Sequence, residues 1–276
     1  MVMLPFLANE KISAETLFEG FNVDLQSTAD LVKNLANYNP TVWNFVSAIT
    51  KQVMTPLAIA ILTVLVVLEF SNAARKLSAT DGGATFEFFA PLILRLIMVV
   101  ILLPNAMNII EAILEVGTHV ISGAARIVSK GGMSYDTFSG FKGKGIVGNM
   151  LIGFIAILIF VCRLISVVIV NVLITMRFIQ LYLMTPFTPL AIATLIHEEH
   201  RHIGIGFFKN VIAYAIQGVL IFLVVAFVSL FQNAANANAT GVVQFIGAVT
   251  GSIVQAILLI VALIGTQRTA RNIMGM

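Results

Sequence analysis

The fold is decided between Asn210 and Gln267, where 58 consecutive residues carry no charge: NVIAYAIQGVLIFLVVAFVSLFQNAANANATGVVQFIGAVTGSIVQAILLIVALIGTQ. A second apolar stretch, Ile146–Ile196, carries only Arg163 and Arg177 as charges. Hydrocarbon offers backbone groups no water, so only segments that close their own hydrogen bonds cross it, and about 20 apolar helical residues suffice. Both stretches are far longer than a buried soluble helix needs. The sequence therefore predicts an all-α, polytopic integral membrane protein.

Composition and charge agree with this class. Hydrophobic residues make up 59% of the chain, charged residues 11%, and the mean hydropathy is +0.99. Soluble domains carry about 25% charged residues, so a soluble globular protein is excluded. The charged residues after Glu199 are all basic. Under the positive-inside rule, this basic end predicts a cytoplasmic C-terminus in a multi-pass protein of the cell membrane.

Two segments mix charged and apolar residues at helical spacing and predict amphipathic helices at the membrane surface. The first is Val23–Leu35, which Pro40 should end. The second is Asn105–Val128. Its apolar face would comprise Ile109, Ile113, Val116, Val120 and Ile127.

Four spans follow directly from the apolar runs: Val53–Glu69, Phe88–Leu103, Val211–Phe231 and Val242–Ile264. Polar connections are expected at Ser71–Glu87, His197–Lys209 and Gln232–Thr240. The predicted organisation is an N-terminal amphipathic segment (1–52), the first two spans (53–103), an amphipathic helix and glycine-rich loop (104–145), the C-terminal membrane helices (146–267) and a short basic tail (268–276).

The stretch Ile146–Ile196 admits either one or two spans, which gives five or six transmembrane helices in total. One helix of this length would be about 75 Å long, more than twice a ~30 Å hydrocarbon layer, which favours two spans. However, neither glycine nor proline occurs between Phe154 and Thr185, so a hairpin would lack turn residues. On an unbroken helix, Arg163 and Arg177 would also share one polar stripe with Ser166.

The distribution of basic residues supports the other alternative. With the C-terminus inside, six spans place eleven basic residues inside and two outside, whereas five spans place six inside and seven outside. The positive-inside rule therefore favours six spans, and the lack of helix breakers favours five.

Three arginines interrupt the predicted spans, and each needs a polar partner, a wet cavity or a route to the interface. Insertion of an arginine costs at least ~2.5 kcal/mol. Arg163 and Arg177 are candidates for a translocation path, as are Lys142 and Lys144 in the glycine-rich loop. The alternative for the arginines, including Arg95, is pairing with Glu69, with carbonyl groups or with lipid headgroups.

The segment His197–His202 (HEEHRH) does not have the spacing of a zincin helix, because Arg201 stands where the second histidine belongs. We interpret it as a solvated loop whose charges set topology, with a structural metal or pH sensing as minor alternatives. No nucleophile–base arrangement, intramembrane carboxylate pair or nucleotide loop is recognisable. The sequence therefore predicts no enzymatic activity, catalytic residue, cofactor or metal ion.

Helix breaks and helix packing have their own signals. Pro186 and Pro189 interrupt a membrane helix, and such breaks often line cavities because freed carbonyls need new partners. Gly247 and Gly251 have the GxxxG spacing that permits close helix approach, consistent with a homo-oligomer.

These features together resemble a known family. The order Arg177, Tyr182, Pro186 and Pro189-Leu190-Ala191, then a short charged turn and Phe208-Lys209-Asn210, resembles the TrbL-type polytopic inner-membrane subunit of type IV secretion systems, particularly the version from conjugative elements of Gram-positive bacteria. The resemblance is clearest over residues 146–271. Relative to larger members, the chain has a short central region and no long C-terminal domain.

The resemblance implies a multi-pass channel or scaffold subunit that helps DNA or a protein–DNA complex cross the membrane. It implies an outside N-terminus, about five spans, and assembly with other channel subunits and with ATPases that supply energy. Membrane lipid and transferred DNA are further candidate partners. Two alternatives remain open at this stage: a secondary transporter for an anionic solute, and a purely structural membrane scaffold.

Overall fold

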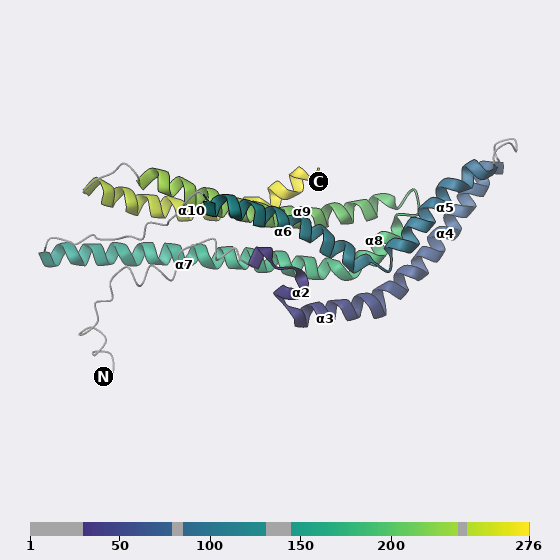
Figure 1. Ribbon diagram of the computed structural model, residues 1–276, viewed down its shortest axis with the longest axis horizontal. Coiled ribbons are helices and arrows are strands. Elements are labelled where there is room, and N and C mark those ends of the chain that lie inside the picture. Colours follow the sequence, from purple (N-terminus) through teal and green to yellow (C-terminus); the bar gives the residue numbers. More distant parts are fainter. Residues whose placement is uncertain (1–29, 79–84, 131–144, 237–241, 276) are drawn as a thin grey trace. The chain divides into compact units, whose positions relative to one another are not determined.

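The computed structural model of the protein describes residues 30–78, 85–130, 145–236 and 242–275. These residues form helices and turns without a β-strand, so the all-α prediction is confirmed for them (Figure 1). The helices are α2 (Leu35–Tyr38), α3 (Pro40–Ile49), the π-helix η2 (Thr50–Met54), α4 (Thr55–Ser78), α5 (Thr85–Leu102), α6 (Ala106–Lys130), α7 (Gly145–Met184), the 3₁₀ helix η3 (Thr185–Phe187), α8 (Thr188–Thr194), α9 (Arg201–Asn236) and α10 (Val242–Ile273).

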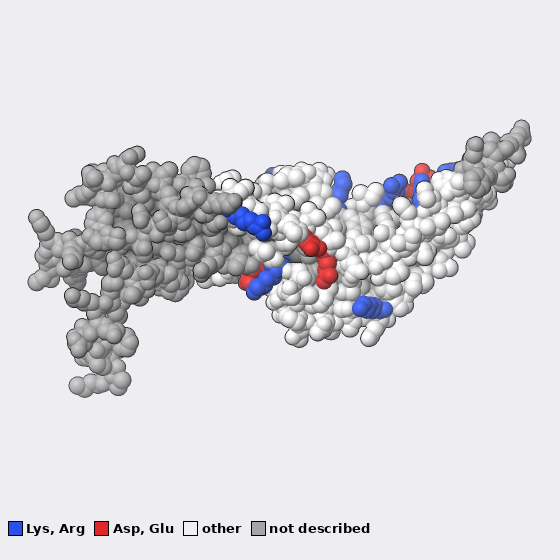
Figure 2. All heavy atoms as spheres, in the orientation of Figure 1, with Lys and Arg blue, Asp and Glu red and all other residues white. Residues whose placement is uncertain are grey.

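Three stretches of the described residues are long and apolar enough to cross a membrane: Pro40–Ser78, Leu164–Thr194 and Arg201–Phe227. A fourth arises if Phe89–Leu102 and Ala106–Val128, which meet at an angle of 80°, form one broken span. The described surface is correspondingly poor in charge, with lysine, arginine and acidic side chains in small groups (Figure 2). A multi-pass membrane protein is therefore supported.

The chain divides into two compact units. One comprises residues 30–121, 174–219 and 267–276, and the other comprises residues 1–29, 122–173 and 220–266. Most of the second unit's side chains lie outside the described set. The packing and the site described below belong to the first unit.

Pro40 begins a helix instead of ending one. It occupies the first turn of α3, where its missing amide is not needed, and Asn39 caps that helix by accepting a hydrogen bond from the Val42 amide at 3.1 Å. The amphipathic helix predicted over Val23–Leu35 lies mostly outside the described residues. Its described end is a single 3₁₀ turn at residues 30–32, so the prediction of a helix continuing to Leu35 is wrong there.

The π-helix η2 accommodates Pro56. A proline ring clashes with the carbonyl four residues earlier, and widening the turn moves that carbonyl away. The Thr55 amide and hydroxyl both donate to the Thr50 carbonyl, the latter at 2.8 Å. The Thr50 hydroxyl in turn donates to the Val46 carbonyl at 2.7 Å. Helices α3 and α4 therefore continue into each other as one long apolar element.

The connections predicted around α4 and α9 are shorter than expected. Helix α4 continues to Ser78 and carries Arg75 and Lys76, α9 begins at Arg201, and α9 ends at Asn236. Charged and polar side chains favour water but do not break a helix, so the helices extend past their apolar segments. For the same reason, most of the predicted basic tail belongs to α10, which ends at Ile273.

The core of the first unit lies where α8 packs on α4 and α5 (Figure 1). The buried residues of α4 are three or four apart and those of α5 are seven apart, so on each of these two helices they form one stripe. The buried residues are Ala58, Leu62 and Leu65 of α4, Leu92 and Val99 of α5, Leu103 and Ala106 beyond it, and Ile192, Ala193 and Ile196 in and after α8.

Helix α6 forms as predicted, but a different face packs inside the protein. The side chains of Val116, Val120 and Ile127 from the predicted apolar face are exposed, by 68%, 50% and 76%. The buried side is a neighbouring stripe that includes Ile110 and Leu114. Periodicity recognised the helix correctly, and the contact of its exposed apolar face with the membrane or a partner stays a prediction.

Helix α7 is one continuous helix of 40 residues, as the absence of helix breakers predicted. It is about 60 Å long at ~1.5 Å per residue, roughly twice a hydrocarbon layer. It ends at Met184, and the predicted break follows at Pro186 and Pro189. Pro189 has no amide for the Thr185 carbonyl, and the Thr188 amide donates to it instead.

Gly204 is required where α9 starts against α8. A Cβ at this position would lie 2.5 Å from the Ala191 carbonyl oxygen, whereas a Cβ at Gly206 would meet nothing within 4 Å. Gly204→Ala should therefore lower the free energy of unfolding by about 1–3 kcal/mol through overpacking. Gly206→Ala should leave it unchanged or raise it slightly, because alanine favours a helix. Thermal unfolding of the detergent-solubilised proteins tests the pair, and equal effects would contradict the close approach.

Candidate functional site

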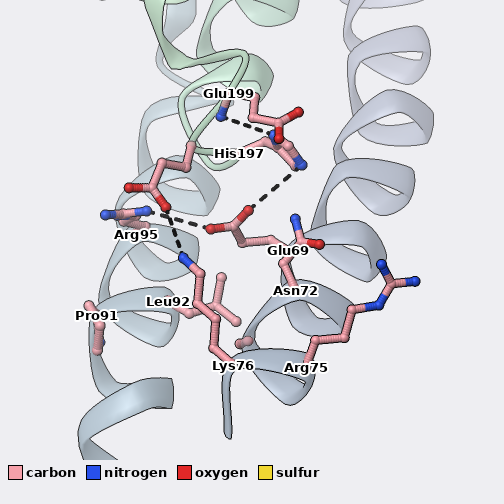
Figure 3. A pocket seen from close by; sticks show the side chains of 11 residues that line it. Glu69, Asn72, Arg75, Lys76, Pro91, Leu92, Arg95, His197 and Glu199 are labelled. Atoms are coloured by element: carbon pink, nitrogen blue, oxygen red, sulfur yellow. Dashed lines mark hydrogen bonds and ion pairs between the residues drawn. The ribbon is translucent and has the colours of Figure 1, made fainter. Parts of the chain in front are cut away.

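A cavity of about 790 Å³ lies where α4 and α5 meet the turn between α8 and α9 (Figure 3). It is rich in charged groups of both signs, set at the end of an otherwise apolar core. The lining residues are Glu69, Asn72, Ala73, Arg75 and Lys76 from α4, Pro91, Leu92 and Arg95 from α5, and His197, Glu198 and Glu199 from the turn.

Glu69 stands at the centre of this site because of its helical register. It continues the buried stripe of α4 after Leu62 and Leu65, so its carboxylate lies on the side of the helix that faces the core. Arg95 follows Leu92 on α5 in the same way. A carboxylate in such a position needs partners, because burying an unpaired charge costs several kcal/mol.

The two oxygens of Glu69 face different partners (Figure 3). Oε1 lies 3.7 Å from Nη1 of Arg95, and Oε2 lies 3.8 Å from Nε2 of His197. Of the three side chains, that of Arg95 is the most exposed, at 33%. Oε2 of Glu69 is buried and has no hydrogen-bond partner among the described residues. The pairing of Arg95 with Glu69 is the alternative that the sequence offered for this arginine.

His197 organises the turn that follows α8. Its Nδ1 accepts a hydrogen bond from the Glu199 amide at 3.3 Å, and it lies 3.2 Å from Nδ1 of His200. Nδ1 of His202 lies 2.8 Å from the Glu199 carbonyl oxygen. His197, Glu199 and His200 thereby bring three ligand-type atoms within 4.8 Å of one another.

The solvated-loop interpretation of this turn is wrong for His197. Glu198, Glu199 and His200 are exposed, but His197 is only 3% exposed. Lys76 and Glu198 form an ion pair at 3.4 Å across the rim of the cavity, with both side chains 65% exposed. Such an exposed pair contributes little to stability. Glu69 and His197, in contrast, meet through buried side chains, 11% and 4% exposed.

Arg177 lies in the packed interior of the first unit, away from any open surface. It is 1% exposed, its Nε donates to the Tyr214 carbonyl at 2.8 Å, and its guanidinium carbon lies 5.4 Å from the centre of the Phe178 ring. Gly218 leaves room for it, since a Cβ there would lie 2.5 Å from the guanidinium carbon. Nη1 of Arg177 and Oε1 of Gln217 have no hydrogen-bond partner among the described residues.

The other predicted site residues are only partly described. Lys142 and Lys144 lie outside the described residues, and Arg163 lies in α7 with its side chain outside them. Gly247 and Gly251 lie in α10, likewise without described surroundings. Of the four predicted path residues, only Arg177 has described surroundings, so the path stays a prediction. Sequence reasoning overlooked Glu69 as a site residue, although its place on the apolar stripe of α4 was a signal.

Comparison with known proteins gives one match. The family model described as TrbL/VirB6 plasmid conjugal transfer like protein matches residues 22–189, more than half of the chain. The match includes the predicted motif up to Pro189, and the part of the expected resemblance from residue 190 to 271 lies beyond it. No curated protein and no solved structure matches the chain.

Glu69→Gln should destabilise the protein by about 1–3 kcal/mol, because it leaves Arg95 and His197 facing an uncharged amide at a buried position. Glu115→Gln is the matched control. Glu115 pairs with His119 at 3.8 Å, but the two side chains are 71% and 77% exposed, so a change within about 0.5 kcal/mol is expected. Unfolding of the two purified variants in detergent measures the difference. Similar losses in both would contradict the special role of Glu69.

Proposed function

Because this chain belongs to the TrbL/VirB6 plasmid conjugal transfer-like family, we propose that it is a membrane channel or scaffold subunit of a conjugative type IV secretion system. The observation that carries the proposal is the family match over residues 22–189, in a chain with three or four helices suited to crossing a membrane. The subunit would help DNA, or a protein–DNA complex, cross the cell membrane. The subunit would be of the type found in conjugative elements of Gram-positive bacteria.

We propose that the chain acts in an assembly and supplies no chemistry of its own. Its partners would be other channel subunits, ATPases that provide energy, membrane lipid and further copies of itself. The GxxxG pair Gly247 and Gly251 on α10 supports contact between copies. The rival function, a secondary transporter using the break at Pro186, is less favoured. Pro186 and Thr188 are buried, and Ile192 of the following helix belongs to the hydrophobic core.

For the topology, we propose five spans with the N-terminus outside and the C-terminus in the cytoplasm. The unbroken hydrogen-bond ladder of α7 supports this arrangement, because a sixth span would require a hairpin between Gly145 and Met184. About half of the ~60 Å helix would then project beyond the bilayer. The basic residues of segments 1–52 and 104–145 would lie outside, against the positive-inside tendency, whereas Arg75 and Lys76 would lie inside.

For the translocation path, we propose Arg163, Lys142 and Lys144 as groups that attract the phosphate backbone. Positive charge suffices for this attraction, since phosphate contacts require no base recognition. We do not propose Arg177 as one of these phosphate-attracting groups. A guanidinium group that is 1% exposed and bonded to a helix carbonyl acts as a packing group in the described conformation.

Conjugation tests the function directly. A donor strain lacking the chain should lose DNA transfer, and the wild-type chain should restore it. A Lys142→Ala, Lys144→Ala, Arg163→Ala triple variant should reduce DNA crosslinking during transfer at least about tenfold relative to the wild type, because losing ~1.4 kcal/mol of attraction is a tenfold effect.

The control for this experiment is Lys51→Ala, an exposed lysine of η2, at matched membrane abundance. Undiminished crosslinking in the triple variant would reject the proposed path residues but not the proposed function. Undiminished transfer without the chain would reject the proposed function.

Accessibility of single cysteines tests the topology. In a Cys162→Ser background, five spans predict that cysteines at Gly20 and Phe138 react with an impermeant maleimide added to intact cells, while one at Ser78 reacts only after lysis. Six spans predict the reverse at these three positions. A cysteine at Asn238 should react from outside under both topologies and serves as the positive control.

A further inference from the structure

We propose that His197, Glu199 and His200 bind a divalent transition-metal ion of the zinc type. Their ligand-type atoms lie within 4.8 Å of one another in the turn between α8 and α9. Imidazole nitrogens joined by a carboxylate oxygen are a ligand set that suits zinc and its neighbours in the first transition series. This inference stands apart from the role in conjugation, because it uses none of the proposed path residues.

The two histidines are placed as ligands of a common ion would be. Their Nδ1 atoms are 3.2 Å apart. Two nitrogen ligands at the usual Zn–N distance of ~2.0–2.1 Å, at the tetrahedral angle, are about 3.3–3.4 Å apart. Two imidazole nitrogens at this distance either share a ring N–H proton in a hydrogen bond or ligate a common metal ion. Glu199 lies between the histidines in sequence and offers an exposed carboxylate to the same centre.

The tautomer of His197 is the one that binds a metal through Nδ1. The Glu199 amide donates to this nitrogen at 3.3 Å, which puts the ring proton on Nε2, and a metal ion bound at Nδ1 would replace this hydrogen bond. Nε2 in turn faces Oε2 of Glu69 at 3.8 Å (Figure 3). A ligating histidine usually directs its second ring nitrogen at a carboxylate, which fixes its orientation and raises its basicity.

Glu69 therefore has a defined part in this site. Its Oε2 is buried and has no hydrogen-bond partner among the described residues, so it is free to accept the Nε2 proton of His197 as that ring turns toward a metal. The ion would connect the exposed start of α9 to His197, and through Glu69 to α4. Metal binding would thus fasten the turn onto the α4–α5 pair.

Metal titration of the full-length protein tests the proposal. The protein is purified in detergent without an oligohistidine tag, in the Cys162→Ser background, so that neither a tag nor the thiol competes. It should bind one equivalent of Zn²⁺, and bound Co²⁺ should give the visible absorption of a four-coordinate site. His200→Ala and Glu199→Gln, both at exposed positions, should weaken Zn²⁺ binding at least tenfold. Glu69→Gln should weaken it about 10–100-fold.

His202→Asn is the matched control, since His202 lies in the same turn but outside the three-residue cluster. It should bind Zn²⁺ within about twofold of the parent protein. The melting temperature should rise with Zn²⁺ in the parent and in His202→Asn, but not in His200→Ala. Absence of Zn²⁺ binding in the parent would overturn the proposal and assign a shared proton to the pair. Equal binding by parent and His200→Ala, or equal weakening by His202→Asn, would also overturn it.

Discussion

A backbone group that leaves water has to find its partner inside the protein, and the described structure follows from this constraint. Within the helices, regular backbone hydrogen bonds satisfy this constraint. Next to the prolines, threonine residues provide further hydrogen bonds to the backbone carbonyls. The Thr55 hydroxyl donates a second hydrogen bond in the widened turn before Pro56. The Thr188 amide donates to the Thr185 carbonyl, to which Pro189 has no N–H to donate. The π-helix η2 and the 3₁₀ helix η3 therefore interrupt regular α-helix within apolar sequence while these carbonyls stay paired. Helix α8, which follows η3, packs on α4 and α5.

The same constraint applies to side chains and explains why the polar site lies where it does. The stripe of α4 that builds the core ends at Glu69, and the core segment of α8 ends at His197. Glu69 reaches its position by helical register and His197 by the turn that follows α8, and each would be costly to bury alone. Together with Arg95 they form a polar layer over the end of the core. That layer stabilises one particular pairing of α4 with the turn, because a shift of either segment would leave a charge without its partner.

The sequence predicted the helices better than it predicted which helices and side chains contact one another. The lack of glycine and proline before Thr185 correctly predicted one long α7, since nothing in that stretch interrupts its hydrogen bonds. Pro40 was misjudged because the same residue can end one helix or begin the next, and the Asn39 cap decides for the second. The contact of Glu69 with His197 could not be predicted from residue spacing, because the two residues lie in segments far apart in the chain. A structural metal at His197–His202 stayed a minor alternative because helical ligand spacing was applied to residues that form a turn.

Arg177 illustrates how a cation persists inside apolar packing. Placing it there costs at least ~2.5 kcal/mol, and its described contacts offset part of this: a hydrogen bond to the Tyr214 carbonyl and the face of the Phe178 ring. Gly218 supplies the space that any side chain at that position would fill. Because a guanidinium group reaches a carbonyl of α9 only where this gap exists, α7 and α9 fit together in one register. The sequence offered two explanations for this arginine, a translocation path and pairing with carbonyl groups, and its described hydrogen bond is of the second kind.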